Sequence, residues 1–303
     1  MNVAVIGANG QLGSDVVNSF AEKGDNVYSI THAELEVRSL EAVNVCLEKC
    51  CAEIVVNTAA MHHVDNCELD PEKAYAVNAI GARNLAAVTR NLGATLIQVS
   101  TDYVFDGKKN TPYAEDDAPL PLQVYGNSKL AGEYHVRTLN PKHFVLRTSA
   151  LYGEHPCRAK GGRNFVDLML ELARTRHRVR VIDDEFVSPT PTVDLAHQIV
   201  CLSRCDHYGL YHATAEDCCS WYEFAREIFW LTETDVKLEV AEPGEFPAKA
   251  PRPRYSVLEN GGLKGIGLNL FTSWKTGLRH YLSTAQSPLR SALEQGDSIV
   301  TKK

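Results

Sequence analysis

The first thirteen residues constrain the fold most, because they join a short apolar run to three regularly spaced glycines. Residues 2–6 are mainly apolar, Gly7, Gly10 and Gly13 follow them, and Val16, Val17 and Phe20 then recur at helical spacing. This order predicts a strand, a tight turn and a helix. Such a turn lets the backbone approach a pyrophosphate, and the amino end of the helix favours anionic phosphates. The segment therefore predicts a dinucleotide-binding loop.

The first half of the chain alternates short apolar runs with longer helical patterns. Apolar runs lie at residues 27–30, 54–57, 95–100 and 143–148, and helical patterns at residues 40–50, 72–92 and 128–138. Alternation of this kind indicates a parallel, doubly wound α/β sheet. We expect a dinucleotide-binding Rossmann domain in residues 1–150.

The alternation loosens after about residue 152. Gly161-Gly162, Pro189-Thr190-Pro191 and the proline-rich stretch 243–253 mark loops between shorter elements. We expect residues 151–285 to form mainly a smaller, irregular C-terminal substrate lobe, with some segments returning to the Rossmann domain. Residues 286–303 are polar enough to predict a flexible tail.

Composition excludes several classes of protein. The chain has 303 residues, is 44% hydrophobic and carries a formal net charge of −7. It is long enough for a large core, it has no run approaching the roughly 20 apolar residues of a membrane span, and its acidic balance argues against nucleic acid as a partner. Nine cysteines, an odd number with adjacent pairs, favour a reducing compartment, and no cluster has metal-ligand spacing. We expect a cytoplasmic protein without a bound metal.

Tyr125 and Lys129 are the candidates for acid–base chemistry. Side chains four residues apart project from one face of a helix. Because a tyrosine phenol has a pKa of about 10 and a nearby cation favours the phenolate, we expect Lys129 to bring Tyr125 toward useful acid–base strength. An exposed Tyr–Lys pair on a solvated helix has the same spacing, and the nucleotide loop favours the functional interpretation.

Longer motifs extend these two features. Together with the glycine turn, Thr101-Asp102-Tyr103-Val104-Phe105-Asp106-Gly107 and Tyr125-Gly126-Asn127-Ser128-Lys129-Leu130-Ala131-Gly132-Glu133 resemble the extended short-chain dehydrogenases/reductases. The chain is most similar to the dTDP-4-dehydrorhamnose reductase family, and the resemblance covers nearly its whole length. It implies NAD(P)H-dependent reduction of a 4-keto group on a nucleotide-activated deoxysugar.

The resemblance also assigns roles to residues. Tyr125 would donate a proton, Lys129 would bind the nicotinamide ribose, and Thr101 would hydrogen-bond the carbonyl being reduced, where negative charge develops. The predicted cofactor-binding residues are Gly7, Asn9, Gly10, Gln11, Leu12, Gly13, His32, Glu36, Val37, Ala59, Ala60, Met61, Val99, Tyr125 and Lys129. The predicted substrate-binding residues are Thr101, Asp102, Asn164 and Arg252.

The cofactor is NADPH or NADH. An acidic residue that would hold the adenosine ribose is not evident in Ser29-Ile30-Thr31-His32, which favours NADPH slightly. His32 would lie near a 2′-phosphate, and Glu34 and Glu36 would oppose that phosphate if they faced it. Both cofactors therefore stay open at this point.

Three positions depart from the family pattern and leave the sugar open. Ala150 stands where the family usually has Trp, and Glu185 and Val187 stand where Gln and Gly are usual. Basic residues near the expected cleft include Arg158, Lys160 and Arg163. Two other functions stay open, a non-catalytic NADP-binding regulatory subunit similar to methionine adenosyltransferase β and a sugar-nucleotide epimerase or dehydratase. A homodimer is among the expected assemblies.

Overall fold

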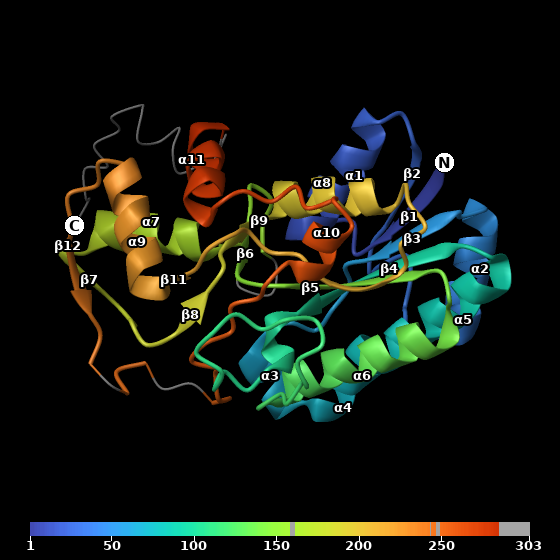
Figure 1. Ribbon diagram of the computed structural model, residues 1–303, viewed down its shortest axis with the longest axis horizontal. Helices are drawn as coiled ribbons and strands as arrows, with labels where there is room; N and C mark the ends of the chain where they lie inside the picture. Colours follow the sequence, from blue (N-terminus) through green and yellow to red (C-terminus); the bar gives the residue numbers. More distant parts are fainter. Residues whose placement is uncertain (158–160, 243, 247–248, 285–303) are drawn as a thin grey trace, which may run out of the picture.

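Six parallel strands form the centre of the larger half of the computed structural model (Figure 1). The structure describes residues 1–157, 161–242, 244–246 and 249–284. The strands in spatial order are β10 (Gly209–His212), β5 (His143–Thr148), β4 (Thr95–Thr101), β3 (Ile54–Asn57), β1 (Asn2–Ile6) and β2 (Asn26–Ile30). The chain leaves β1 for β2 on one side and then crosses to β3 on the other. This confirms the predicted α/β class with a doubly wound parallel sheet.

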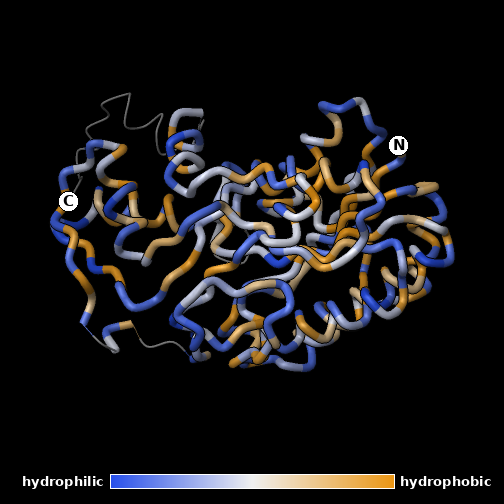
Figure 2. Tube along the Cα trace, in the orientation of Figure 1, coloured by the Kyte–Doolittle hydropathy of each residue, from blue (hydrophilic) through white to orange (hydrophobic). Residues whose placement is uncertain are grey.

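Alternating side chains of β1 divide the apolar core into two layers. Val3 and Val5 pack on the side of α1 (Gln11–Glu22) and α8 (Thr192–Leu202). Ala4 and Ile6 pack on the opposite side, which α2 (Leu40–Cys50), α5 (Ala82–Leu92) and α6 (Val124–Leu139) cover. Figure 2 shows the resulting concentration of hydrophobic chain in the strands. Because both faces of a parallel sheet are buried, its strands need apolar residues at consecutive positions.

A π-helical turn interrupts the helix predicted over residues 72–92. The segment consists of α4 (Pro71–Tyr75), the π turn η1 (Ala76–Gly81) and α5. Within the turn, the Asn78 side-chain amide donates to the Met61 carbonyl and to Ser128 Oγ, both at 2.9 Å, and its oxygen accepts from the Met61 amide. The turn thereby ties the loop after β3 to α6.

The second lobe has a core of its own, although the sequence predicted an irregular region. Helices α7 (Phe165–Thr175), α9 (Trp221–Leu231) and α11 (Trp274–Thr284) pack with the parallel pair β7 (Arg178–Val181) and β12 (Lys237–Val240). Shorter pairs are formed by β6 (Leu151–Tyr152) with β9 (Thr190–Pro191) and by β8 (Phe186–Val187) with β11 (Cys219–Ser220). Between these elements, α8 and β10 return to the Rossmann sheet. The regularity was missed because its strands are too short for a clear pattern.

Parts of two predictions cannot be placed. The expected tail at residues 286–303 and the basic residues Arg158 and Lys160 lie outside the described residues. In the part of the chain that is described, no helix combines the length and apolar character needed to traverse a bilayer.

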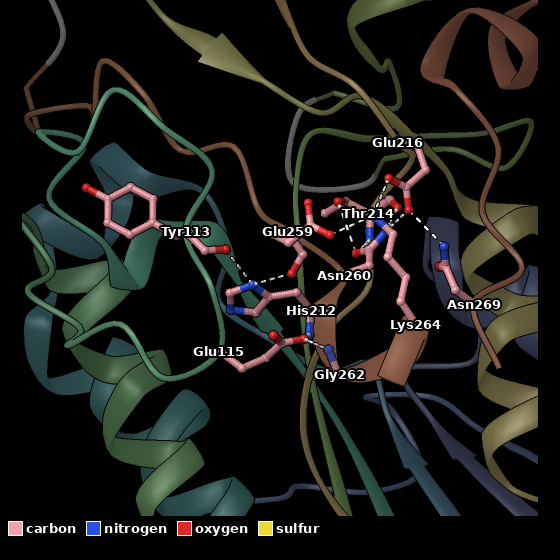
Figure 3. A network of polar contacts seen from close by, with 10 residues as sticks. All are labelled: Tyr113, Glu115, His212, Thr214, Glu216, Glu259, Asn260, Gly262, Lys264 and Asn269. Atoms are coloured by element: carbon pink, nitrogen blue, oxygen red, sulfur yellow. Dashed lines mark hydrogen bonds and ion pairs between the residues drawn. The ribbon is translucent and has the colours of Figure 1, made fainter. Parts of the chain in front are cut away.

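A buried histidine fixes the edge of the sheet (Figure 3). His212 Nδ1 lies 3.0 Å from the Tyr113 carbonyl oxygen and 3.1 Å from that of Glu259. Because both neighbours are acceptors, Nδ1 carries a proton, and burial lowers the pKa of His212 to about 3, so the ring is neutral. Glu115 Oε1 accepts from the amides of His212 and Gly262, each at 3.0 Å.

The same network extends into α10 (Gly261–Gly265). Asn260 Nδ2 donates to the Thr214 carbonyl at 2.8 Å and to Glu216 Oε1 at 2.9 Å. Lys264 Nζ donates to Glu216 at 2.9 Å and to Glu259 at 2.6 Å (Figure 3). The segment that precedes α10 is therefore anchored to the edge strand from several directions.

Candidate active site

A cavity of about 270 Å³ lies at the carboxyl ends of the parallel strands. This is the edge at which open α/β sheets bind their ligands. Ten predicted site residues line it: Gly10, Gln11, Leu12, Gly13, Ala60, Val99, Thr101, Asp102, Tyr125 and Lys129. Residues of the second lobe, including Val187 and Trp221, close it on the other side.

The glycine turn packs closely against the neighbouring backbone. Gly7 has φ +81°, and a Cβ there would lie 2.8 Å from Thr58 Oγ1. A Cβ at Gly13 would lie 2.2 Å from the Gly7 carbonyl oxygen, so the turn and α1 pack too closely for any side chain. Gly10 is the N-cap of α1 and provides no side-chain hydrogen bond. The amino end of α1 therefore fits the pyrophosphate of a dinucleotide.

Tyr125 and Lys129 lie in α6 and both line the cavity. Lys129 Nζ donates to the Val99 carbonyl at 2.6 Å, and burial lowers the pKa of Lys129 to about 8 although Glu133 opposes the shift. Burial raises the pKa of Tyr125. The expectation that Lys129 lowers the pKa of Tyr125 is therefore wrong for this arrangement, because Lys129 interacts with Val99 and desolvation of the phenol dominates. Tyr125 is a neutral phenol at neutral pH.

Asp102 binds three hydroxyl groups. Its Oδ1 accepts from Thr101 Oγ1 at 3.0 Å, and its Oδ2 accepts from Ser149 Oγ at 2.8 Å and from Ser256 Oγ at 2.5 Å. Burial raises the pKa of Asp102 to about 6, and the three hydroxyls oppose that shift. Asp102 also lines the cavity, and its contact with a sugar stays a prediction.

A buried ion pair supports α6 beneath the cavity. Arg147 binds Glu133 through Nη2–Oε2 at 2.8 Å and Nε–Oε1 at 3.0 Å, and each residue is 1% exposed. Ser100 Oγ donates to Glu133 Oε1 at 2.5 Å. Because Ser100 and Arg147 belong to β4 and β5 and Glu133 to α6, these contacts fix α6 to both strands.

The predicted adenosine end contains a cation that sequence reasoning missed. Arg38 Nη2 donates to Glu36 Oε2 at 2.5 Å, and this hydrogen bond contributes most to lowering the pKa of Glu36 to about 2. Asn84 Nδ2 donates to the carbonyls of Val37 and Arg38, each at 3.0 Å. His32 adds a weaker electrostatic contribution to the same carboxylate. The sequence feature that could have identified Arg38 is its position two residues after Glu36, with which it pairs.

Several predicted residues do not line the cavity. Gly7 and Asn9 belong to the turn before α1, the Ala59 amide donates to Asn57 Oδ1 at 3.1 Å, and Met61 is held by Asn78. His32, Glu36 and Val37 also lie outside the lining.

Two of the predicted substrate-binding residues have protein partners. Asn164 caps α7 through a capping box, and its Nδ2 donates to the Gly153 carbonyl at 2.9 Å. Arg252 Nη2 binds Asp65 Oδ1 at 3.0 Å. Neither Asn164 nor Arg252 lines the cavity, and their contact with a substrate stays a prediction.

The end of the cavity formed with the second lobe is mostly apolar. Ala150, Cys157, Val187 and Trp221 line it. The Trp221 ring lies 4.6 Å from the Phe165 ring, measured between centroids.

Glu185 does not line the cavity. Its carboxylate is hydrogen-bonded by the Trp221 side chain, and burial raises the pKa of Glu185. The Glu185 carboxylate, at one of the positions that depart from the family pattern, therefore interacts with Trp221. Trp221 was not among the site residues predicted from the sequence.

Comparisons with known proteins agree with this geometry. Residues 1–287 match the model of the family described as the RmlD substrate binding domain. The chain is 37% identical over 285 residues to the spore coat polysaccharide biosynthesis protein SpsK of Bacillus subtilis, covering 94% of this chain and 98% of that protein. A crystal structure of a dTDP-4-dehydrorhamnose reductase from Clostridium acetobutylicum is 40% identical, with a TM-score of 0.89 over 93% of this chain and 99% of that one.

A second solved structure contains a cofactor. The dTDP-4-dehydrorhamnose reductase of Bacillus anthracis in complex with NADP is 36% identical, with a TM-score of 0.88 over 93% of this chain and 98% of that one. The resemblance found in the sequence motifs is thereby confirmed along nearly the whole chain.

Proposed function

This chain belongs to the RmlD substrate binding domain family, and on that premise we propose that it reduces the 4-keto group of a nucleotide-activated deoxysugar with NADPH or NADH. The observation that carries the proposal is the gathering of Thr101, Tyr125 and Lys129 in one cavity with the glycine turn. The reductase names of the solved relatives support the same reaction.

Different residues of the cavity are proposed to bind the cofactor and to transfer a proton. The amides after Gly10 would hold the pyrophosphate of the cofactor, and Lys129 would hold the hydroxyls of its nicotinamide ribose. When bound, the cofactor supplies a hydride to the carbonyl carbon. Tyr125 donates its proton to the carbonyl oxygen as negative charge develops there. Burial favours this direction because it keeps the phenol protonated until a stronger base forms.

The test is oxidation of NADPH and NADH with a panel of dTDP- and UDP-linked 4-keto sugars. Wild type should oxidise cofactor with at least one sugar, and Tyr125→Phe should lower kcat by about 1,000-fold with little change in cofactor affinity. Tyr134→Phe is the matched control, because Tyr134 lies on the same helix and is 52% exposed. Unchanged turnover in Tyr125→Phe would refute the assignment.

The same assay separates the two other functions. A regulatory subunit would bind cofactor without oxidising it, and an epimerase would convert the sugar without net consumption of added cofactor. Neither outcome shows the stoichiometric oxidation that a reductase requires.

The protein is further proposed to form a homodimer through the outer side of α4, η1 and α6. Tyr75, Ile80 and Tyr134 on these elements are 41%, 42% and 52% exposed. Large exposed apolar side chains on neighbouring elements favour burial against a second copy. Light scattering should give twice the chain mass, and Tyr134→Glu should reduce the measured mass.

The nine free cysteines support action in the reducing cytoplasm, which cell fractionation would test.

A further inference from the structure

Thr148 places a buried hydroxyl group at the cavity. It is the last residue of β5, it is 5% exposed, and it is one of the residues that line the cavity. Its Oγ1 makes no hydrogen bond with any residue in the part of the chain that the structure describes. Because an unsatisfied buried hydroxyl costs folding free energy, such a group at the edge of a ligand cavity indicates a partner in the ligand.

The pattern of β5 gives the direction of this side chain. Phe144 and Leu146 belong to the same core layer as the buried residues of α1. Alternate side chains of a strand project to the same face, so Thr148 projects to the face that α1 covers. Arg147 projects to the opposite face, where it binds Glu133 of α6. The Thr148 hydroxyl therefore lies on the side of the sheet at which the glycine turn leads into its helix.

The order of the strands orients a dinucleotide across this face. The spatial order is β5, β4, β3, β1 and β2. The predicted adenosine end, at Glu36 and Arg38, follows β2, and the glycine turn follows β1. Val99 of β4 accepts from Lys129, and β5 ends at Thr148. A dinucleotide with its adenosine at β2 and its pyrophosphate at the glycine turn therefore extends its nicotinamide half toward the ends of β4 and β5.

Thr148 lies beside Thr101 across a pair of strands. Thr101 ends β4 and is the register partner of Thr148, and neighbouring strands are about 4.8 Å apart. C4 of the nicotinamide ring carries the hydride, and the adjacent carbon C3 carries the carboxamide. In a reactive arrangement the carbonyl carbon lies about 3–3.5 Å from C4. The carbonyl and the carboxamide are then separated by a distance comparable to the spacing of the strands, so a carbonyl at Thr101 places the carboxamide within reach of Thr148.

We infer that Thr148 is a cofactor-binding residue whose hydroxyl forms a hydrogen bond with the carboxamide of the nicotinamide. The inference rests on the proposed function, which supplies the dinucleotide, and extends it to the orientation of the ring. A hydroxyl both donates and accepts, and a carboxamide offers an acceptor oxygen and two donor hydrogens, so the two groups match. With Lys129 at the ribose and Thr148 at the carboxamide, the ring is held at two points and one of its faces is directed toward the carbonyl.

Removal of the Thr148 hydroxyl should weaken only ligands that contain the nicotinamide. Thr148→Val should bind NADPH and NADH about tenfold more weakly, because the buried carboxamide loses its partner. Isothermal titration calorimetry would compare these affinities with those for 2′-phospho-ADP-ribose and ADP-ribose, the fragments that lack only the nicotinamide. The affinities for the two fragments should stay within twofold of the wild type. Thr148→Ser keeps a hydroxyl and should bind all four ligands nearly as the wild type does.

Thermal unfolding of the ligand-free proteins separates this role from a structural one. Because the Thr148 hydroxyl has no hydrogen-bond partner among the described residues, Thr148→Val should unfold at or above the temperature of the wild type. Thr89→Val is the matched control, because Thr89 is fully buried and its hydroxyl donates to the Leu85 carbonyl at 2.7 Å. It should unfold at a lower temperature and keep the wild-type affinity for cofactor. If Thr148→Val does not fold, Thr148→Ala removes the same hydroxyl and should give the same selective loss.

The outcomes distinguish this inference from the proposed function. A folded Thr148→Val protein that binds NADPH and NADH as tightly as the wild type would overturn the inference, even if the sugar panel shows turnover. Equal weakening of the cofactors and of their nicotinamide-free fragments would also overturn it, because the hydroxyl would then act on another part of the dinucleotide. A wild type that binds neither cofactor would refute the inference and the proposed function together. The predicted affinities without turnover on the sugar panel would support the inference and refute only the proposed reduction.

Discussion

The two ends of the cavity are built in different ways: the end at the glycine turn, where we propose that the cofactor binds, is called the cofactor end, and the end at the second lobe, where we propose that the sugar binds, is called the sugar end. The cofactor end comes from the turn at residues 7–13 and from one face of α6, so neighbouring residues in sequence supply most of it. The sugar end combines Ala150, Cys157, Val187 and Trp221 from four separate segments. Close backbone packing limits substitution at the cofactor end, whereas the sugar end is lined by residues of several segments.

This difference predicts how substitutions act. At the cofactor end, a side chain that does not fit meets backbone and disturbs the turn itself, as the 2.2 Å approach at Gly13 illustrates. At the sugar end, a substitution changes the shape of a wall while the strands stay in place. Large effects on cofactor binding and small effects on sugar choice are therefore expected.

Gly13→Ala should have the largest effect. The new methyl group would meet the Gly7 carbonyl, and overpacking of this kind costs about 3 kcal/mol, which corresponds to a loss of about 100-fold in NADPH affinity. Isothermal titration calorimetry with NADPH would measure this affinity. Gly265→Ala is the control, because nothing lies within 4 Å of a Cβ there. Equal affinities in the two variants would show that the cofactor end is less constrained than we infer.

Lys129→Met should have the next largest effect. Loss of a buried ammonium that binds the ribose should lower kcat/KM for NADPH about 30-fold, since hydrogen bonds to charged groups contribute about 1.5–3 kcal/mol. The pKa of Lys129 is about 8, so the wild-type kcat/KM should fall as pH rises through that value and the ammonium loses its proton. The variant should lack this alkaline limb. If kcat/KM of the Lys129→Met protein still falls as pH rises through that value, the titrating group is a different residue.

The contrast between neighbouring and distant residues also explains which features could be predicted from the sequence. The strands at residues 54–57 and 143–148 and the helix at residues 40–50 have the predicted bounds, because local apolar patterns specify them. Tyr125 and Lys129 share a helix face for the same reason. The direction of Lys129 toward the Val99 carbonyl was not predictable, because it depends on how α6 packs against β4.

Other features of the site depend on contacts between distant residues. The Ser256–Asp102 hydrogen bond joins residues 154 apart, and no local pattern indicates it. Asn164 was assigned to the substrate from its motif, whereas the structure shows it capping α7, a use that its position before Phe165 and three residues before Asp167 already permitted. Trp221, at the start of α9 in the second lobe, lines the cavity together with residues that follow the strands of the sheet.

Trp221→Leu should alter the sugar end alone. An aromatic wall contributes about 1 kcal/mol beyond its buried area, so KM for the sugar should rise about fivefold while the affinity for NADPH stays unchanged. Trp230→Leu is the matched control, because Trp230 is on the same helix and is 66% exposed. A change in cofactor affinity in Trp221→Leu would contradict the separation of the two ends.

Arg38→Ala should have the smallest effect. It tests whether the exposed part of the cofactor end contributes to the binding of NADPH. The Arg38 side chain is 46% exposed and is already paired with Glu36, so its contact with a 2′-phosphate would be screened and partly offset. We expect a loss of about threefold in NADPH affinity and no change for NADH, since exposed ion pairs contribute little. Glu36→Gln should act in the opposite direction, because it frees the guanidinium and removes a charge that repels the phosphate. Both variants should be titrated with both cofactors, and equal changes for NADPH and NADH would place Arg38 away from the phosphate.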